Sequence, residues 1–263
     1  MTNSLPTTLP LSKLVTEMQE SATLKMAKMA RELKAQGKDV IDLSLGEPDF
    51  DTPVHIKEAA KKALDDGYTK YTPVNGLLEL RQAIVNKLAR ENDLHYTVNQ
   101  IVVSNGAKQS VYNLCMALLD PGDEVILPAP YWVSYAEIVK MAGGVPVIAN
   151  SSIEQDFKST PEEIEALITD RTKFILYSSP CNPSGSVFSF EELQALALML
   201  QAHEHVLVVS DEIYEHINFT DRHYTIASME GMKDRTVIIN GMSKGYAMTG
   251  WRIGYIGAPK IIA

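Results

Sequence analysis

Residues 191–211 read EELQALALMLQAHEHVLVVSD, a segment with helical spacing of apolar residues followed by a short β-branched run. The spacing predicts a helix over 191–203, and the run predicts a strand over 206–209 that leads directly to Asp211. The same pair of patterns recurs along most of the chain. The sequence therefore predicts an α/β fold, with a seven-stranded, mostly parallel sheet covered by helices on both faces.

The other predicted elements follow from the same two periodicities. The seven predicted strands are 101–103, 125–127, 145–148, 174–177, 206–209, 237–239 and 253–256. The predicted helices are 78–88, 109–119, 135–141, 161–168 and 191–203, with a further helix over 14–36. Residues 42–50 predict a strand that runs into a loop bent by Gly and Pro. Ligands of such sheets bind where strands end, so polar residues at those ends are the candidates for function.

Composition narrows the class of protein. The chain has 263 residues, 24 Lys plus Arg against 33 Asp plus Glu, and a formal charge of −9. This balance argues against nucleic acid as the main partner. Two cysteines are too few for a disulfide framework, and no apolar run reaches the ~18 residues of a membrane span. Residues 1–10 lack the pattern of a secretory signal, so a cytoplasmic setting without a membrane is expected.

Two candidate sites follow predicted strands. The first, from Ser104 to Gln109, leaves a strand and opens a helix; it is either an anion-binding turn or a generic strand-to-helix turn. The second is Asp211, whose carboxylate could pair with a cation such as a protonated heterocycle nitrogen, or could simply cap a helix.

The third candidate is Lys244, set in a segment rich in glycine and aromatic residues. Desolvation could lower the pKa of its ammonium group and make the amine a nucleophile toward a carbonyl. Ser243 and Arg252 could hold a phosphate beside it. The alternative is an ordinary solvated lysine. The histidines show no metal-ligand spacing, so no metal site is predicted.

Taken together, these segments resemble the class I and II pyridoxal-phosphate-dependent aminotransferases, in the branch of the bacterial aspartate aminotransferases. The run from Ser243 to Tyr255 is similar to the lysine signature of that family. The other matching motifs, in the order of the family, are 45–50, 71–73, 104–109, 130–132, 182–185 and 210–214. The resemblance implies the large domain of the aspartate-aminotransferase-like fold (fold type I) and the cofactor pyridoxal 5'-phosphate.

The resemblance also implies roles around the cofactor ring. Lys244 would attach to the cofactor and carry a proton between the substrate α-carbon and the cofactor. Asp211 would pair with the pyridine nitrogen and, with Lys244 and Tyr214, form the catalytic group. Tyr214 and Asn182 would hydrogen-bond the phenolic oxygen, and Trp132 would stack on the ring.

A second group would hold the phosphate and the substrate. The implied phosphate-end residues are Gly106, Ala107, Lys108, Ser243, Arg252 and, from a partner subunit, Tyr71, which makes a homodimer part of the expected site. The implied substrate-binding residues are Gly46, Trp132, Asn182, Thr23 and Lys108. Because Thr23 and Lys108 resemble the contacts to a distal carboxylate, the expected substrates are aspartate or glutamate with a 2-oxo acid such as 2-oxoglutarate, in amino-acid biosynthesis.

Domain organisation is expected to follow the family. Residues 1–45 would form an N-terminal arm that belongs with the small domain, and 46–263 would form the cofactor-binding large domain. The C-terminal small domain, with its carboxylate-binding arginine, would be absent, which would impair the chain. Two alternatives remain open: a carbon–sulfur lyase that uses the same cofactor, and a truncated module that binds cofactor without catalysis.

Overall fold

The computed structural model describes residues 11–18, 22–44, 46–220 and 222–263. The chain divides into two compact units, Met1–Gly46 and Glu47–Ala263. The candidate residues at strand ends all lie in the second unit.

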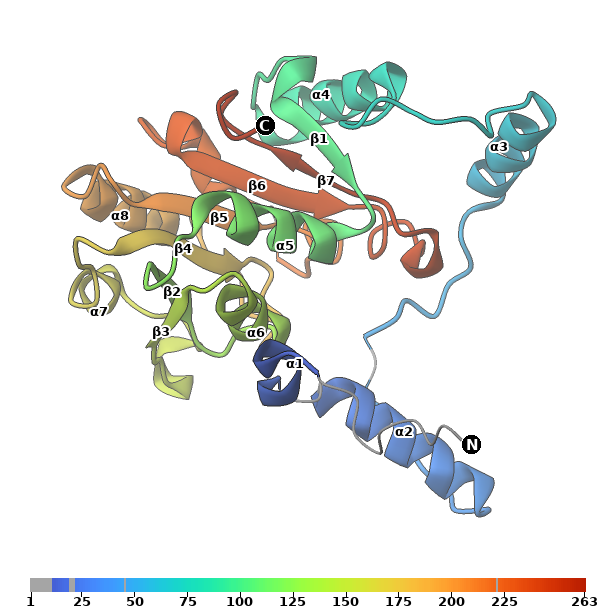
Figure 1. Ribbon diagram of the computed structural model, residues 1–263, viewed down its shortest axis with the longest axis horizontal. Coiled ribbons are helices and arrows are strands. Elements are labelled where there is room, and N and C mark those ends of the chain that lie inside the picture. The colour runs from blue at the N-terminus through green and yellow to red at the C-terminus, as the bar shows by residue number, and fades with distance from the viewer. Residues whose placement is uncertain (1–10, 19–21, 45, 221) are drawn as a thin grey trace, which may run out of the picture. The chain divides into compact units, whose positions relative to one another are not determined.

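The second unit is built on one sheet of seven strands in the order β1-β7-β6-β5-β4-β2-β3 (Figure 1). The strands are β1 (Ile101–Ser104), β2 (Glu124–Pro128), β3 (Val145–Ala149), β4 (Thr172–Ser178), β5 (Leu207–Asp211), β6 (Thr236–Gly241) and β7 (Gly254–Gly257). Only β7 runs antiparallel to its neighbours, β1 and β6. The seven strands and the mostly parallel sheet predicted from the sequence are confirmed.

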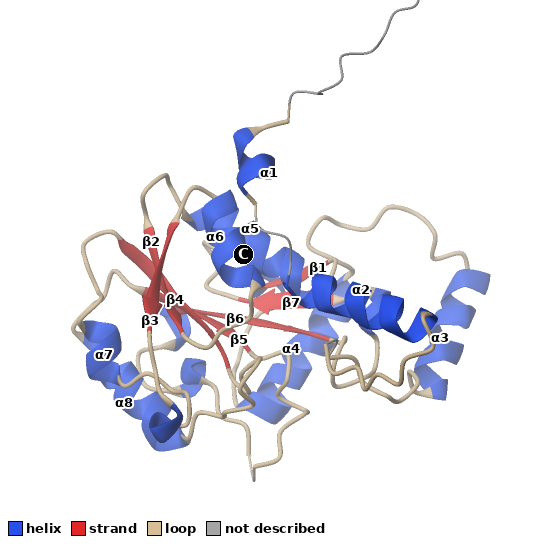
Figure 2. Ribbon diagram, turned by 90° about the horizontal axis from the view of Figure 1, so that it is seen from below, coloured by secondary structure: helices blue, strands red, loops and turns tan. Residues whose placement is uncertain are grey.

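The described residues of the second unit also form six helices (Figure 2). They are α3 (Val54–Asp65), α4 (Leu78–Asn92), α5 (Ala107–Leu118), α6 (Ser134–Met141), α7 (Pro161–Glu165) and α8 (Phe190–Gln201). The sequence predicted all of them except α3. Local signals explain the start of α8, where Ser189 accepts from the Glu192 backbone and the Glu192 side chain reciprocates. No helix in the described ranges is long and apolar enough to cross a membrane.

The core lies on both faces of the sheet because successive strand residues point in opposite directions. In β4, Phe174 and Leu176 pack with α5 and α6, whereas Ile175 and Tyr177 pack with α7 and α8. Helix α4 packs on the β1–β7 end of the sheet. Its residues Ile84 and Leu88 form one buried cluster with Tyr255 of β7. The carboxyl ends of the parallel strands are therefore held rigidly between two helical layers.

The first unit differs from its prediction in two places. The helix expected over 14–36 is interrupted: α1 (Lys13–Glu17) ends at Met18, whose backbone is extended, and α2 (Ala22–Ala35) follows. The described residues of α1 are exposed, so no apolar packing extends that helix. The strand expected from residue 42 does not form in the described residues, because Asp42 instead accepts bonds from the backbone and hydroxyl of Ser44. Of the predicted arm, 1–10, 19–21 and 45 lie outside the described residues.

Candidate active site

Asp211 is a buried carboxylate at the end of β5, with 4% of its surface exposed. The Tyr135 hydroxyl donates to its Oδ2 at 2.6 Å, and the Ile213 backbone donates to its Oδ1 at 3.2 Å. Burial raises the pKa of Asp211 to about 6, although the Tyr135 hydrogen bond opposes this. No ion pair to Asp211 is seen within the described ranges. The site is thus equipped to receive a cation at this oxygen pair.

Lys244 follows β6, and its Nζ lies 5.7 Å from the centre of the Tyr214 ring. Burial lowers the pKa of Lys244; the Glu47 carboxylate opposes this, and the Arg252 charge adds to it. Asn182 donates to the Tyr214 hydroxyl at 3.3 Å, so the loop after β4 is tied to the turn after β5. A lysine with a lowered pKa holds more of its amine in the neutral, nucleophilic form.

A corner where Arg252 meets the N-terminus of α5 is the candidate anion site. Gly106 has a φ of +83°, and a Cβ there would lie 2.0 Å from Arg252 Nη2, so the guanidinium rests directly against this glycine. A Cβ on Gly254 would lie 2.3 Å from the Ala107 nitrogen. Because Gly254 has no side chain, the N-terminus of α5 can lie directly against strand β7. Helix N-termini and arginines both favour phosphate.

Lys108 adds a second cation to this corner. Its pKa is lowered by burial and by the nearby Arg252 charge. The Lys108 Nζ lies 4.7 Å from the centre of the Trp132 ring. Trp132 in turn meets Tyr135 edge to face, with ring centres 5.5 Å apart. The aromatic pair therefore links the anion corner to the buried Asp211 carboxylate.

Tyr135 was not predicted as a site residue, because the sequence of 135–141 indicates a helix and contains no motif of a functional site. Its side chain is fully buried in α6 among apolar residues. A phenolic hydroxyl in such a place needs a hydrogen-bond partner. That requirement was the available signal, but only the fold shows that Asp211 is the partner.

The roles of three other predicted residues stay predictions, and Ser243 lies beside Lys244 in the chain. The Tyr71 side chain is fully exposed between α3 and α4. Thr23 and Gly46 belong to the first unit, so their roles stay predictions. Ser243 is buried next to Lys244, and its backbone oxygen accepts from Met248 at 3.1 Å.

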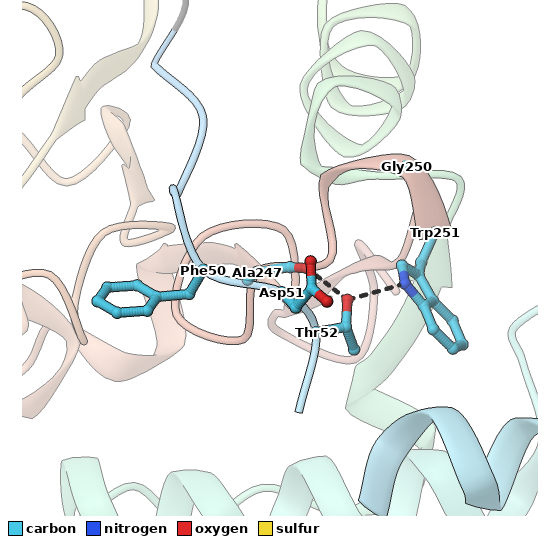
Figure 3. A pocket seen from close by; sticks show the side chains of 6 residues that line it. All are labelled: Phe50, Asp51, Thr52, Ala247, Gly250 and Trp251. Atoms are coloured by element: carbon cyan, nitrogen blue, oxygen red, sulfur yellow. Dashed lines mark hydrogen bonds between the residues drawn. The ribbon is translucent and has the colours of Figure 1, made fainter. Parts of the chain in front are cut away.

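A pocket of about 450 Å³ flanks the loop that carries Lys244 (Figure 3). Thr52 closes one side: its hydroxyl donates to the Ala247 oxygen at 2.5 Å and accepts from the Trp251 indole at 3.1 Å. These bonds attach the segment around Thr52 to the loop between β6 and β7. The lining residues are Phe50, Asp51, Thr52, Ala247, Gly250 and Trp251.

The fold and the site together define a class of protein: an α/β chain that presents an amine, a buried carboxylate and a cationic corner at one edge of its sheet. Comparison with known families agrees. The model of aminotransferase class I and II matches residues 38–263. The chain belongs to this family, and it has the fold of the aspartate aminotransferases, as the structures below show.

Individual relatives are similar along nearly the whole chain. The aspartate/prephenate aminotransferase of Nitrosomonas europaea is 50% identical over 254 residues, and the aspartate aminotransferase of Geobacillus stearothermophilus is 51% identical over 254. In each case the match covers 96% of this chain but 64% of the relative. The structure of Thermus thermophilus aspartate aminotransferase with maleate has a TM-score of 0.93 and 46% identity, over 97% of this chain and 66% of that one. An aromatic aminotransferase from Pyrococcus horikoshii has a TM-score of 0.83 and 44% identity, over 92% of this chain and 63% of that one.

Class I and II aminotransferases depend on pyridoxal phosphate, and the residues present fit that group. The phosphate has a matching corner of Gly106, Lys108 and Arg252. A ring nitrogen that carries a proton has a matching partner in the buried carboxylate of Asp211. The aldehyde carbon has a matching amine in Lys244.

Proposed function

We propose that this chain is the cofactor-binding part of an aminotransferase that moves an amino group between an L-amino acid and a 2-oxo acid. The observation that carries the proposal is the half-buried Lys244 amine beside Tyr214, with its pKa lowered by burial. The chain spans about 64% of the length of the curated relatives, so the activity of the whole protein is part of the proposal.

Each residue of the proposed site has a role that follows from its position. When bound, pyridoxal phosphate supplies a carbonyl that condenses with amines and a ring that takes up electrons from the substrate α-carbon. Lys244 Nζ holds the proton that is exchanged with the α-carbon. Asp211 holds a proton on the ring nitrogen through charge, and Arg252 with the α5 N-terminus orients the phosphate.

Tyr214 and Asn182 govern the basicity of the reacting amine. Their hydrogen bond holds the Tyr214 hydroxyl, and the centre of the Tyr214 ring lies 5.7 Å from Lys244 Nζ. A phenol can donate a hydrogen bond to the deprotonated form of a neighbouring oxygen or amine. Because this stabilises the deprotonated form, it lowers the pKa of that neighbour. In this proposal the two residues tune the reacting amine in addition to the burial, Glu47 and Arg252 that shift the pKa of Lys244.

For the substrate we propose a dicarboxylic amino acid, aspartate or glutamate, with 2-oxoglutarate as an acceptor. Lys108 supports this, because its ammonium lies in the corner beside Trp132 and can meet a second carboxylate. The relatives named for aspartate and the structure of one of them with maleate, a dicarboxylate, support the same choice. Thr23 and Gly46 remain proposed substrate contacts.

We further propose a homodimer in the cytoplasm, with residues 1–45 as an arm that belongs with the small domain of full-length relatives. Helix α3 has no buried residue, although one of its faces is apolar. The loop after α3 exposes Tyr71 and Val74 completely. A second copy would cover this surface and bring Tyr71 toward a phosphate. Sedimentation of Val74→Lys should show a weaker dimer, whereas Phe219→Lys, at another exposed apolar residue, should not.

The test of the proposed function begins with the spectrum. Incubation with pyridoxal phosphate should give a visible absorption band, and borohydride reduction should leave the cofactor mass on the peptide that contains Lys244. Lys244→Ala should lose both signals, while Lys260→Ala, which removes an exposed lysine, should keep them. A chain that stays colourless contradicts the proposal.

Product analysis then separates the reaction types. Addition of glutamate to the loaded chain should convert the cofactor to its amine form and release 2-oxoglutarate. A carbon–sulfur lyase would instead release pyruvate and ammonia from a β-substituted amino acid. Binding without either product would favour the non-catalytic module.

A further inference from the structure

Glu215 is a buried carboxylate immediately after Tyr214, outside the group of residues assigned above. Its side chain is 5% exposed and forms an ion pair with Lys87 of α4. Asn92, also in α4, donates to its Oε2 at 3.2 Å, and Asn240 of β6 donates to its Oε1 at 2.7 Å. Burial alone would raise the pKa of Glu215, but the Lys87 charge and hydrogen bond, the Asn92 hydrogen bond and the nearby His216 bring it below its ordinary value. The carboxylate is therefore a charged anchor between α4 and β6.

Asn240 uses both ends of its amide. The Nδ2 group donates to Glu215, and Oδ1 accepts from the Gly241 backbone at 2.7 Å. The two partners fix which end of the amide faces which way, so the side chain has one orientation. Gly241 then starts the loop that reaches Lys244 three residues later.

A second contact joins the same two segments beyond Lys244. A Cβ on Gly245 would lie 2.9 Å from Nδ1 of His216, so the His216 ring lies directly against the backbone after Lys244. The ring also packs on Tyr246, with centres 5.6 Å apart. The segment 214–216 thus touches the segment 240–246 before and after Lys244.

We propose that the hydrogen bond from Asn240 to Glu215 positions Lys244 against Tyr214, which makes Asn240 and Glu215 positioning residues of this site. Tyr214 is covalently next to Glu215, and Lys244 is four residues from Asn240 in a loop closed again by His216 and Gly245. A shift of the Asn240 pair must therefore change the separation of the amine and the phenol. The inference rests on the proposed function for the role of Lys244, but the contacts and the test do not require cofactor.

The test measures Lys244 alone, by competitive acetylation of the cofactor-free chain between pH 7 and pH 11, with mass spectrometry of the Lys244 peptide. Asn240→Asp replaces the donor amide by a carboxyl group, and in the upper part of this pH range the two buried carboxylates repel one another. The loop should move, and water should reach Lys244. We expect the midpoint of labelling to rise by about one pH unit toward that of an exposed lysine. The charges that face Lys244 from neighbouring segments, Glu47 and Arg252, are unchanged.

The double variant Asn240→Asp with Glu215→Gln exchanges donor and acceptor. The new amide at position 215 can donate to the new carboxylate at position 240, and the total charge beside Lys87 is unchanged. Oδ1 at position 240 still accepts from Gly241, so we expect the wild-type midpoint to return. Asn92→Ala is the matched control, because it removes a hydrogen bond from the same carboxylate without touching the loop; its midpoint should stay at the wild-type value.

Three results would overturn the proposal: an unchanged midpoint in folded Asn240→Asp, a double variant that stays shifted, or an equal shift in Asn92→Ala. If Asn240→Asp does not fold, Asn240→Ala takes its place with the same expectation. A second readout is the pH titration of the visible band with pyridoxal phosphate, which should shift in the same variants. If wild-type chain forms no band, the proposed function fails while the labelling result still decides the positioning role.

Discussion

The buried charge of Asp211 should make the cofactor-free chain less stable than a neutral replacement would. The pKa of Asp211 is about 6 in the folded chain against an ordinary value of 3.8. This difference corresponds to about 3 kcal/mol of unfavourable free energy above pH 6. Asp211→Asn removes the charge but keeps one oxygen for the two donors, Tyr135 and Ile213, so one hydrogen bond worth about 1 kcal/mol is lost. The expected net gain is about 2 kcal/mol.

The stability difference between wild type and Asp211→Asn should depend on pH. A carboxyl whose pKa is raised by folding stabilises the fold while it is protonated, and this contribution is lost as the pH rises from about 4 through about 6. Urea and thermal unfolding of cofactor-free chain at pH 7.5 should therefore favour Asp211→Asn, with a melting temperature about 4–8 °C higher. At pH 4 the advantage should vanish or reverse, because wild-type Asp211 is then neutral in the folded chain.

Asp49→Asn, at an exposed carboxyl, is the control and should change stability little at either pH. Equal stability differences for Asp211→Asn at pH 7.5 and pH 4 would refute the reasoning. Added pyridoxal phosphate should reverse the order at pH 7.5, since only the wild-type carboxylate can pair with a ring cation.

Two further predictions concern the neighbours of this carboxylate and the phosphate corner. Gly106→Ala should weaken pyridoxal phosphate binding by about tenfold or more, because the new methyl group would displace Arg252; Gly122→Ala shares the positive φ, has open space around it, and should bind normally in the same absorbance titration. Tyr135→Phe should raise the pKa of Asp211 further and cost about 1.5–3 kcal/mol at pH 7.5 but less at pH 4, as measured by urea unfolding. Normal binding by Gly106→Ala, or a loss of stability in Tyr135→Phe that is the same at both pH values, would contradict these expectations.

Much of the fold could be predicted because the apolar runs are short and separated by helical spacing. Strands such as β5 and β6 are buried on both faces and therefore read as continuous β-branched runs. Helix α3 was not among the predicted helices, although one of its faces is apolar. The strand expected from residue 42 was wrong, because an extended run needs a neighbouring strand and Asp42 has a local partner instead.

Candidate site residues could be chosen from the sequence where they follow strands and match family motifs. Asp211 and Lys244 could be chosen as candidates from their position alone. Tyr135, Glu215 and Asn240 could not, because their partners are distant in the sequence and depend on how α4 and α6 pack on the sheet. In the sequence, a buried polar residue is visible only as a polar residue within an apolar pattern. The pattern does not identify the hydrogen-bond partner that the residue will have in the fold.

The antiparallel strand β7 has a consequence for how the site is assembled. Strands β6 and β7 form a hairpin that closes where Gly241 pairs with Gly254, and the connection between them holds Lys244 near one end and Arg252 near the other. The separation of the Lys244 amine and the Arg252 guanidinium, the proposed reactive and phosphate-binding groups, is thus set within one closed loop. The hairpin brings both groups into one connection, and contacts from His216 and Thr52 hold that connection from outside. Insertions in this loop should consequently be far less tolerated than insertions in the other connections of the sheet.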